Sequence, residues 1–202
     1  MAINEFKVLF LGESGIGAKT SLLIRIVSNS FDSNVSATNG ASFVSKTIQT
    51  ELGKISLQLW DTVGQEKYRS INAQFIKGAH CIILGYDVTR KESFESIRDF
   101  WYNFLKKKTE RDNVLIYLVG NKIDLDDLGR VTYEEGKSLA NDLNMKFFEV
   151  SAKTRDGVDI LLEDICDSLI NKFIKKIIDT KKSKKEDKSN KIILALGDYL
   201  NY

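Results

Sequence analysis

Short runs of apolar residues alternate along the chain with longer stretches in which apolar residues recur at helical spacing. The predicted strands are residues 6–11, 42–51, 54–60, 81–86, 114–119 and 146–150. The predicted helices are residues 20–27, 93–107, 133–143 and 158–177. The second and third strands flank Gly53 and are expected to form an antiparallel pair. Strands that alternate with helices otherwise predict parallel β-α-β units, and therefore an α/β sheet with helices on both faces.

Composition narrows the possible classes of protein. A length of 202 residues suits one domain with a short remainder, and 43% hydrophobic with 29% charged residues excludes collagen and low-complexity disorder. The 30 Lys and Arg nearly balance 28 Asp and Glu, which argues against nucleic acid as a partner. Cys81 and Cys166 lie in apolar segments, so we expect buried thiols and a cytoplasmic protein. The chain shows no secretory signal pattern and no apolar run of about 18 residues.

A glycine-rich segment, GESGIGAKT, follows the first predicted strand. It nearly matches G-x-x-x-x-G-K-[ST], in which backbone N–H groups bind phosphate, the lysine neutralises phosphate charge and the hydroxyl ligates Mg²⁺. Six residues separate Gly12 from Lys19, one more than in the pattern. Either Ala18 is an inserted residue, or the motif starts at Glu13 and lacks its glycines. A glycine-rich turn without a ligand is the alternative to both.

Another polar motif, DTVGQE, follows the strand that ends near Trp60. Asp61 at the end of this strand could hold Mg²⁺ through water, and the Gly64 N–H could approach a γ-phosphate. Gln65 could orient an attacking water. The motif therefore predicts the hydrolytic side of a nucleotide site, with a polar turn as the alternative.

Two further motifs follow the last two predicted strands. Asp124 in NKID can accept two hydrogen bonds from guanine, a pair of donors that adenine lacks. The lysine of that motif can lie along the base, and a backbone N–H of residues 151–153 (SAK) can reach the guanine O6. Ligands of parallel α/β sheets bind at the carboxyl ends of strands, where these motifs fall. Together they predict a site for a guanine nucleotide with Mg²⁺.

With these motifs, residues 6–173 resemble the Ras superfamily of small GTPases and, within it, the Rab family. Rab-like blocks are LQLWDT at 57–62, FIKGA at 75–79 and YDVT at 86–89. The resemblance implies a three-layer P-loop small G domain, with a six-stranded, mostly parallel sheet, one antiparallel edge strand and about five helices. It also implies a switch that binds GTP or GDP with Mg²⁺, slowly hydrolyses GTP, and regulates vesicle and membrane trafficking.

The resemblance also assigns roles to single residues. Catalytic roles fall to Gln65, Lys19 and Thr38, and Mg²⁺ ligation to Thr20, Thr38 and Asp61. The residues that bind the nucleotide are then Gly15, Ile16, Gly17, Ala18, Lys19, Thr20, Ser21, Phe31, Thr38, Gly64, Asn121, Lys122, Asp124, Ser151, Ala152 and Lys153.

Protein partners are implied by the same resemblance. Phe43, Trp60 and Phe75 match a hydrophobic triad that Rab proteins present to effectors, and the switch regions would also meet exchange factors and GTPase-activating proteins. The alternative is that these aromatic residues belong to the core. Neither the particular effector nor the compartment follows from the sequence.

Three departures from the Rab pattern lead to a second hypothesis. Ala18 lengthens the phosphate loop, Asn39 replaces an apolar residue after Thr38, and Val63 replaces an alanine before Gly64. The stiff β-branched side chain of Val63 could crowd the second switch, the segment that contains Gly64 and Gln65. The alternative function is therefore a pseudo-GTPase adaptor with impaired nucleotide binding or hydrolysis. A P-loop kinase or ATPase is a third possibility, against which Asp124 argues.

The composition changes after residue 175, the predicted end of the G domain. Residues 176–190 are rich in lysine and are read as a solvated linker, with a basic membrane-surface patch as the alternative. Residues 191–202 include KIILALGD, which is similar to the opening KVLFLGE, so we expect the first strand of a second, truncated G domain. The alternative is an apolar tail. The last residues contain no cysteine, so we expect no prenyl anchor in this chain and only peripheral contact with endomembranes.

Overall fold

The computed structural model describes residues 4–33, 42–51, 53–62, 74–108, 114–125 and 130–175. The chain divides into two compact units, Met1–Asp164 and Ile165–Tyr202. The sheet and all residues of the candidate site described below belong to the first unit.

The strands are β1 Asn4–Leu11, β2 Ser42–Thr50, β3 Gly53–Asp61, β4 Cys81–Asp87, β5 Leu115–Asn121 and β6 Lys146–Val150. The helices of the first unit are α1 Thr20–Ser28, α3 Lys91–Ser96, the π-helical segment η2 Ile97–Tyr102, α4 Asn103–Lys106 and α5 Tyr133–Asp142. Helix α6 (Val158–Leu169) crosses the boundary between the units, and the π-helical segment η4 (Ile170–Lys175) lies in the second unit.

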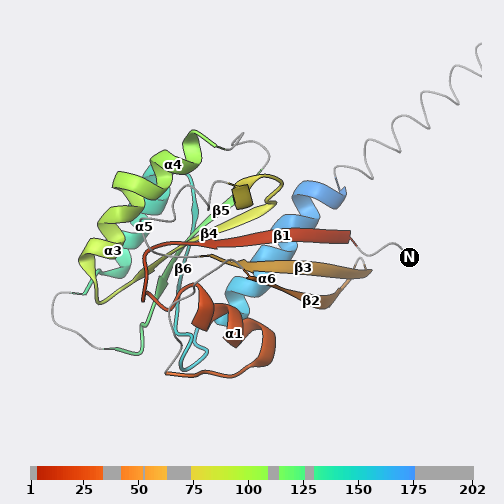
Figure 1. Cartoon of the computed structure of the whole chain (residues 1–202), viewed down its shortest axis with the longest axis horizontal. Coiled ribbons are helices and arrows are strands. Elements are labelled where there is room, and N and C mark those ends of the chain that lie inside the picture. The colour runs from red at the N-terminus through yellow and green to blue at the C-terminus, as the bar shows by residue number, and fades with distance from the viewer. Residues whose placement is uncertain are drawn as a thin grey trace, which may run out of the picture. The chain divides into compact units, whose positions relative to one another are not determined.

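The six strands form one sheet in the order β2-β3-β1-β4-β5-β6 (Figure 1). Only β2 pairs in the antiparallel sense, with β3, and the remaining neighbours are parallel. The predicted α/β fold with one antiparallel edge strand is therefore confirmed. The observed bounds lie within two residues of the predicted ones: β1, β3 and β4 extend beyond them, β2 ends one residue earlier, and β6 is as predicted. Strand β5 starts one residue later and ends at Asn121 rather than at residue 119, because Gly120 and Asn121 continue its pairing with both neighbours.

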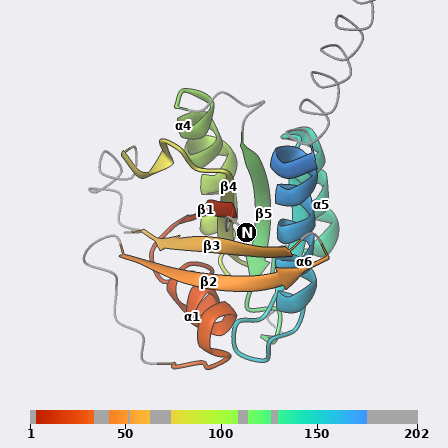
Figure 2. The same cartoon turned by 90° about the vertical axis from the view of Figure 1, so that its right-hand side faces the viewer.

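Both faces of the central strands are buried, as parallel β-α-β units require. Leu9 and Leu11 of β1 pack in a core with Trp101 and Leu139 from the helices on one side. The alternate residues of β1, including Phe10, point to the other face and are also buried. Figures 1 and 2 agree in placing α1 and α4 on opposite faces of the sheet.

The helix predicted at 93–107 is one continuous helical stretch from Lys91 to Lys106, in which η2 forms a π-helical middle. The helix predicted at 133–143 begins at Tyr133, and Thr132 caps it. Cys81 and Cys166 are both buried, as expected for thiols in apolar segments.

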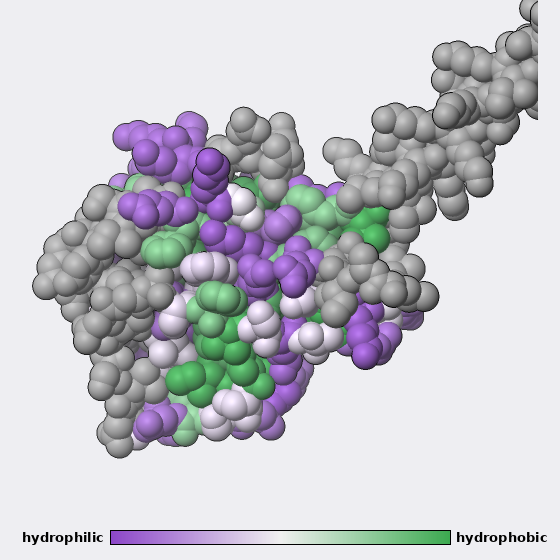
Figure 3. Space-filling model, turned by 45° about the vertical axis from the view of Figure 1, so that its right-hand side comes forward, coloured by the Kyte–Doolittle hydropathy of each residue, from purple (hydrophilic) through white to green (hydrophobic). Residues whose placement is uncertain are grey.

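The outer surface mixes hydrophobic and hydrophilic side chains. On the face shown in Figure 3, hydrophobic residues form a band bordered by hydrophilic ones. Scattered apolar side chains on a surface are ordinary, so this band by itself indicates no partner. Within the part of the chain that the structure describes, no helix has both the length and the apolar character needed to cross a membrane.

Candidate functional site

The loop between β1 and α1 changes direction at three glycines. Gly12, Gly15 and Gly17 have φ angles of 145°, 72° and 69°, a region that favours glycine over residues with a side chain. A Cβ at Gly17 would lie 2.7 Å from the Asn121 side-chain nitrogen, so the loop can approach β5 closely only without one. The motif therefore keeps the glycines at Gly12 and Gly17, and the extra residue follows them.

Lys19 lies directly before α1 with only 5% of its surface exposed. Its ammonium donates a hydrogen bond to the carbonyl oxygen of Glu13, back across the loop. Burial lowers the pKa of Lys19 to about 8, against the opposing influence of Asp61 and Glu13, and Arg90 adds to the decrease. A buried cation that is poorly compensated is suited to pairing with a phosphate, whose charge would restore the usual protonation.

Thr20 and Asp61 meet at the start of α1. The Thr20 hydroxyl donates to the Asp61 Oδ2 at 2.7 Å, although the two residues are 41 positions apart in sequence. Thr62 fixes the end of β3 by donating to the Phe10 carbonyl oxygen at 2.6 Å. Hydroxyl and carboxylate oxygens are hard ligands of the kind that Mg²⁺ prefers. The two side chains therefore fit one Mg²⁺ site next to the phosphate loop.

Asn121 connects three of the predicted motifs. Its Nδ2 donates to the Ile16 carbonyl oxygen at 3.2 Å, and its Oδ1 accepts from the Ala152 N–H at 3.0 Å. Lys122 donates to the Gly15 carbonyl oxygen at 3.2 Å. The phosphate loop, the NKID segment and the SAK segment thus form one bonded structure at the carboxyl edge of the sheet.

Asp124 is held by the segment that follows β6. The Ser151 hydroxyl donates to Asp124 Oδ1 at 2.6 Å, and the Lys153 ammonium lies 3.8 Å from Oδ2. Arg25 of α1 donates to the carbonyl oxygens of Ala152 and Lys153, both at 2.7 Å, and so holds this segment against the helix. The arrangement orients the carboxylate beside a backbone that can offer N–H donors to a base.

Besides Arg25, two further residues that the sequence reasoning did not assign support the site. Asp87, the last residue of β4, forms an ion pair with Lys122 at 2.6 Å and accepts from the Thr89 N–H at 2.9 Å. Lys122 has a φ of 71°, unusual for a residue with a side chain, and the Asp87 contact helps to hold it there. Arg90 donates to the Ser14 carbonyl oxygen at 3.1 Å. Asp87 could have been found, because it stands at the carboxyl end of a predicted strand like the other motifs.

Some predicted site residues cannot be compared with the structure. Thr38, Gly64 and Gln65 lie outside the described residues, as do the departures Asn39 and Val63. Ser21 is the second residue of α1, and Phe31 follows that helix with its side chain partly exposed.

The three aromatic residues of the predicted effector triad are contiguous. Phe43 of β2 stacks on Trp60 of β3 at 4.8 Å between ring centroids, and Phe75 lies 5.5 Å from the same indole. Phe43 is 53% exposed, whereas Trp60 and Phe75 are partly buried against the core. Lys7 places its ammonium 4.8 Å from the Trp60 ring centroid. The cluster therefore combines a core contact with an exposed aromatic face.

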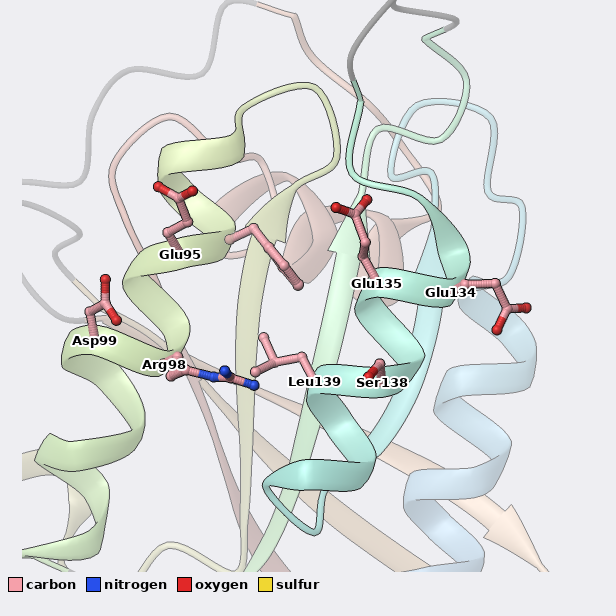
Figure 4. A pocket seen from close by; sticks show the side chains of 8 residues that line it. Glu95, Arg98, Asp99, Glu134, Glu135, Ser138 and Leu139 are labelled. Carbon is pink, nitrogen blue, oxygen red and sulfur yellow. The ribbon is translucent and has the colours of Figure 1, made fainter.

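A separate groove of about 490 Å³ lies between α3 with η2 and α5 (Figure 4). Its lining residues are Phe94, Glu95, Arg98, Asp99, Glu134, Glu135, Ser138 and Leu139. Figure 4 shows Arg98 and Leu139 pointing toward each other from the two sides. Arg98 is already paired with Asp142 at 2.8 Å. None of the residues predicted to bind nucleotide lines this groove.

In the described ranges, no group of three or more His, Cys, Asp or Glu residues is arranged to hold a metal ion. The Thr20–Asp61 pair is a smaller set of ligands. Mg²⁺ is commonly bound by one or two carboxylates or hydroxyls together with substrate phosphates and water, so a set of this size is appropriate to it.

Comparison with known proteins covers most of the chain. Residues 7–171 match the Ras family. The chain is 43% identical to the Ras-related protein RabC of Dictyostelium discoideum over 166 residues, which are 79% of this chain and 83% of the relative. It is 41% identical to the Ras-related protein Rab-18 of Lymnaea stagnalis over 168 residues, 83% of this chain and 82% of that protein. It is 42% identical to the GTP-binding protein ypt2 of Schizosaccharomyces pombe over 153 residues, 76% and 75% of the two chains.

Proposed function

Because the chain belongs to the Ras family of small GTPases, we propose that it is a Rab-type switch that binds GTP and GDP with Mg²⁺ and slowly hydrolyses GTP. Its Rab-named relatives support a small GTPase of membrane trafficking. The observation that carries the proposal is that the Asn121 side chain forms hydrogen bonds with both the phosphate loop and the SAK segment. A phosphate-binding and a base-binding region are thereby joined at one edge of the sheet.

The phosphates are bound by Lys19 and by the backbone N–H groups of residues 15–21, at the N-terminus of α1. Mg²⁺ would be held by Thr20, Thr38 and Asp61, and it would neutralise charge that develops on the phosphate oxygens. Gln65 orients the attacking water, with the Gly64 N–H near the γ-phosphate. Family resemblance assigns the roles of Thr38, Gly64 and Gln65.

Guanine is recognised by Asp124, which accepts hydrogen bonds from the base N1–H and exocyclic amine. Lys122 lies along the base, a backbone N–H of residues 151–153 reaches O6, and Phe31 packs on the ring. Adenine lacks the donor pair, so with adenine the largely buried carboxylate would lose both of its hydrogen bonds to the base. The other residues of the binding set are Gly15, Ile16, Gly17, Ala18, Ser21, Ser151 and Lys153.

The base assignment predicts a change of specificity on Asp124→Asn. An amide pairs poorly with guanine but matches xanthine, which has a carbonyl at the position of the exocyclic amine. We expect affinity for GDP to fall by roughly 100-fold or more and xanthosine diphosphate to become the better ligand. Fluorescent-nucleotide displacement measures both, with Asp159→Asn, at an exposed position in the first turn of α6, as a matched control. An unmodified chain that prefers ADP to GDP would contradict the assignment and favour a P-loop kinase or ATPase.

The hydrolysis assignment predicts slow intrinsic turnover, on the order of 10⁻⁴ s⁻¹, as for unaided Ras in general. Gln65→Leu should reduce single-turnover hydrolysis by about tenfold or more, because the water loses its orienting amide. Phosphate release from GTP-loaded protein is the measurement. If basal hydrolysis is absent and Gln65→Leu changes nothing, the pseudo-GTPase adaptor is the better description.

Regulators and effectors would contact the exposed face of the triad formed by Phe43, Trp60 and Phe75. Phe43→Ala removes the exposed ring while leaving the nucleotide site untouched. Association of this chain with endomembranes would be peripheral and would depend on such partners and on the lysine-rich residues 176–190.

A further inference from the structure

Ala18, the extra residue of the phosphate loop, is completely buried. The N–H of Leu22 donates to the carbonyl oxygen of Gly17 at 3.0 Å, five positions back, whereas the next N–H, of Leu23, returns to the ordinary spacing with Lys19. The loop therefore accommodates one additional residue as a single wide turn at the entrance to α1.

The extra residue leaves the first part of the loop in place. Gly15 and Ile16 still accept hydrogen bonds from Lys122 and Asn121. The displacement caused by Ala18 must therefore be absorbed between Gly17 and α1. Lys19 and Thr20, the two residues proposed to meet phosphate and Mg²⁺, are the next residues along the chain.

Gly85 lies opposite Ala18, in the middle of the fully buried strand β4. Its φ is not positive, so its backbone conformation does not require glycine. A Cβ at Gly85 would overlap the Cβ of Ala18 and would lie 3.3 Å from Ile16 Cδ1. The strand thus lacks a side chain at the position where the extra residue of the loop is buried.

The neighbouring contacts are equally close. A Cβ at Gly12 would lie 2.6 Å from Ile16 Cδ1 and would overlap the carbonyl oxygen of Gly85. Loop and strand are therefore packed backbone to backbone on this side. Interiors at this density have little room for an added methyl group, and overpacking shifts the backbone. Lys19 directly follows Ala18, so a shift of Ala18 would be passed on to it.

We propose that Gly85 is a positioning residue of the phosphate loop: it provides the space in which Ala18 is buried and thereby determines where Lys19 and Thr20 lie. Ala18 and Gly85 form a matched pair, in which the lengthened loop is compatible with phosphate binding only because the strand lacks a side chain there. The inference rests on the proposed nucleotide site and deepens it.

The test uses four variants of the full chain: Gly85→Ala, a deletion of Ala18, both changes together, and Gly136→Ala. Gly136 in α5 is the matched control, because a Cβ there would lie 2.5 Å from the Phe147 ring and 2.6 Å from the Tyr86 hydroxyl, and none of its three nearest contacts is in the loop. Tyr86 follows Gly85 in β4 and therefore points to the opposite face of the sheet. Affinities for Mg·GDP and for GMP are measured by displacement of a fluorescent nucleotide. The ratio of the two affinities measures how well the loop binds the β-phosphate, and urea unfolding measures the stability of the fold.

Gly85→Ala should lower the GDP-to-GMP affinity ratio by roughly tenfold, because the added methyl displaces Lys19. The Ala18 deletion should restore most of this ratio in the double variant, since the methyl at 85 then fills the space that Ala18 leaves. Gly136→Ala should leave the ratio unchanged even where it lowers resistance to urea. An unchanged ratio in Gly85→Ala, or effects that simply add in the double variant, would overturn the pairing.

Failure of the proposed function gives a different result. If the unmodified chain binds neither GDP nor GMP, the nucleotide site is wrong, and the pair is judged by unfolding alone. Non-additive shifts of the urea midpoint for the two changes would then support the matched packing, and additive shifts would overturn it.

Discussion

Lys19 combines a positive charge with deep burial, a combination that is costly unless the charge is paired. Burial holds its pKa at about 8, below the usual value for lysine. At pH values between about 8 and the ordinary pKa of lysine, Lys19 binds more protons in the unfolded chain than in the folded one. Its contribution to the free energy of unfolding therefore becomes more favourable as the pH rises through this range. Phosphate binding reverses the balance, because it favours the protonated form.

Nucleotide binding should therefore take up a proton above pH 8. At about pH 8.5, much of Lys19 is deprotonated in the unbound protein and becomes protonated next to the phosphates. Isothermal titration calorimetry of Mg·GDP binding in two buffers of different ionisation enthalpy measures this uptake. At about pH 6.5, Lys19 is already charged, and its contribution should vanish. Equal uptake at both pH values would show that the proton goes elsewhere.

Among the elements, α5 shows how local sequence positions a helix. The Thr132 hydroxyl oxygen accepts from the Glu135 N–H at 3.3 Å, while Glu135 Oε2 accepts from the Thr132 N–H at 2.8 Å. The hydrogen bonds that the Thr132 N–H and hydroxyl donate to the carboxylate lower the pKa of Glu135, so their stabilisation is present above the ordinary pKa and is lost as the pH falls through the lowered value. The preceding Val131 N–H donates to the Val88 carbonyl oxygen at 2.8 Å and ties the start of the helix to the end of β4.

Thr132→Ala should lower the free energy of unfolding by about 1 kcal/mol, because the first turn of α5 loses its cap. Ser138→Ala, an exposed substitution inside the same helix, should leave the free energy of unfolding unchanged or raise it by a few tenths of a kcal/mol. Urea unfolding at neutral pH compares the two. Affinity for Mg·GDP should be unaltered in both, and a selective loss in Thr132→Ala would mean that the cap also positions the site.

For the whole molecule, the open question is where the nucleotide-binding domain ends. Residues 1–175 are the predicted G domain, 176–190 a linker and 191–202 the start of a second domain. Residues 7–171 match the Ras family, which agrees with a domain ending shortly after that range. The linker residues and the tail lie beyond the described part of the chain, so this division stays a prediction.

Brief trypsin digestion in Mg·GDP should therefore cut first among the lysines of residues 176–190. A fragment of about 175 residues should accumulate and keep the GDP affinity of the full chain. Mass spectrometry of the fragments and displacement binding check the two statements, with the undigested chain as the control. Early cleavage within residues 6–171, or a fragment that no longer binds GDP, would place the boundary elsewhere.

The order of elements could be predicted because apolar spacing depends on local geometry, with a period near two in strands and 3.6 in helices. The same reasoning located most of the candidate site, since motifs after parallel strands meet at one edge of the sheet. Asp87 and Arg25 were missed for different reasons. Asp87 follows the same rule and was overlooked, whereas Arg25 contacts residues more than 120 positions away, which no local pattern contains.

By itself, the sequence determined the strands, the helices and the order of the motifs, because each depends on residues near one another along the chain. Only the tertiary structure decided how one extra residue in the loop is accommodated. That outcome depends on whether a distant strand leaves a methyl-sized space beside Ala18, and Gly85 leaves it. Ala18 and Gly85 are 67 positions apart, and their packing is a property of the folded interior. The sequence therefore shows that the loop has one extra residue, but it does not show how that residue is packed.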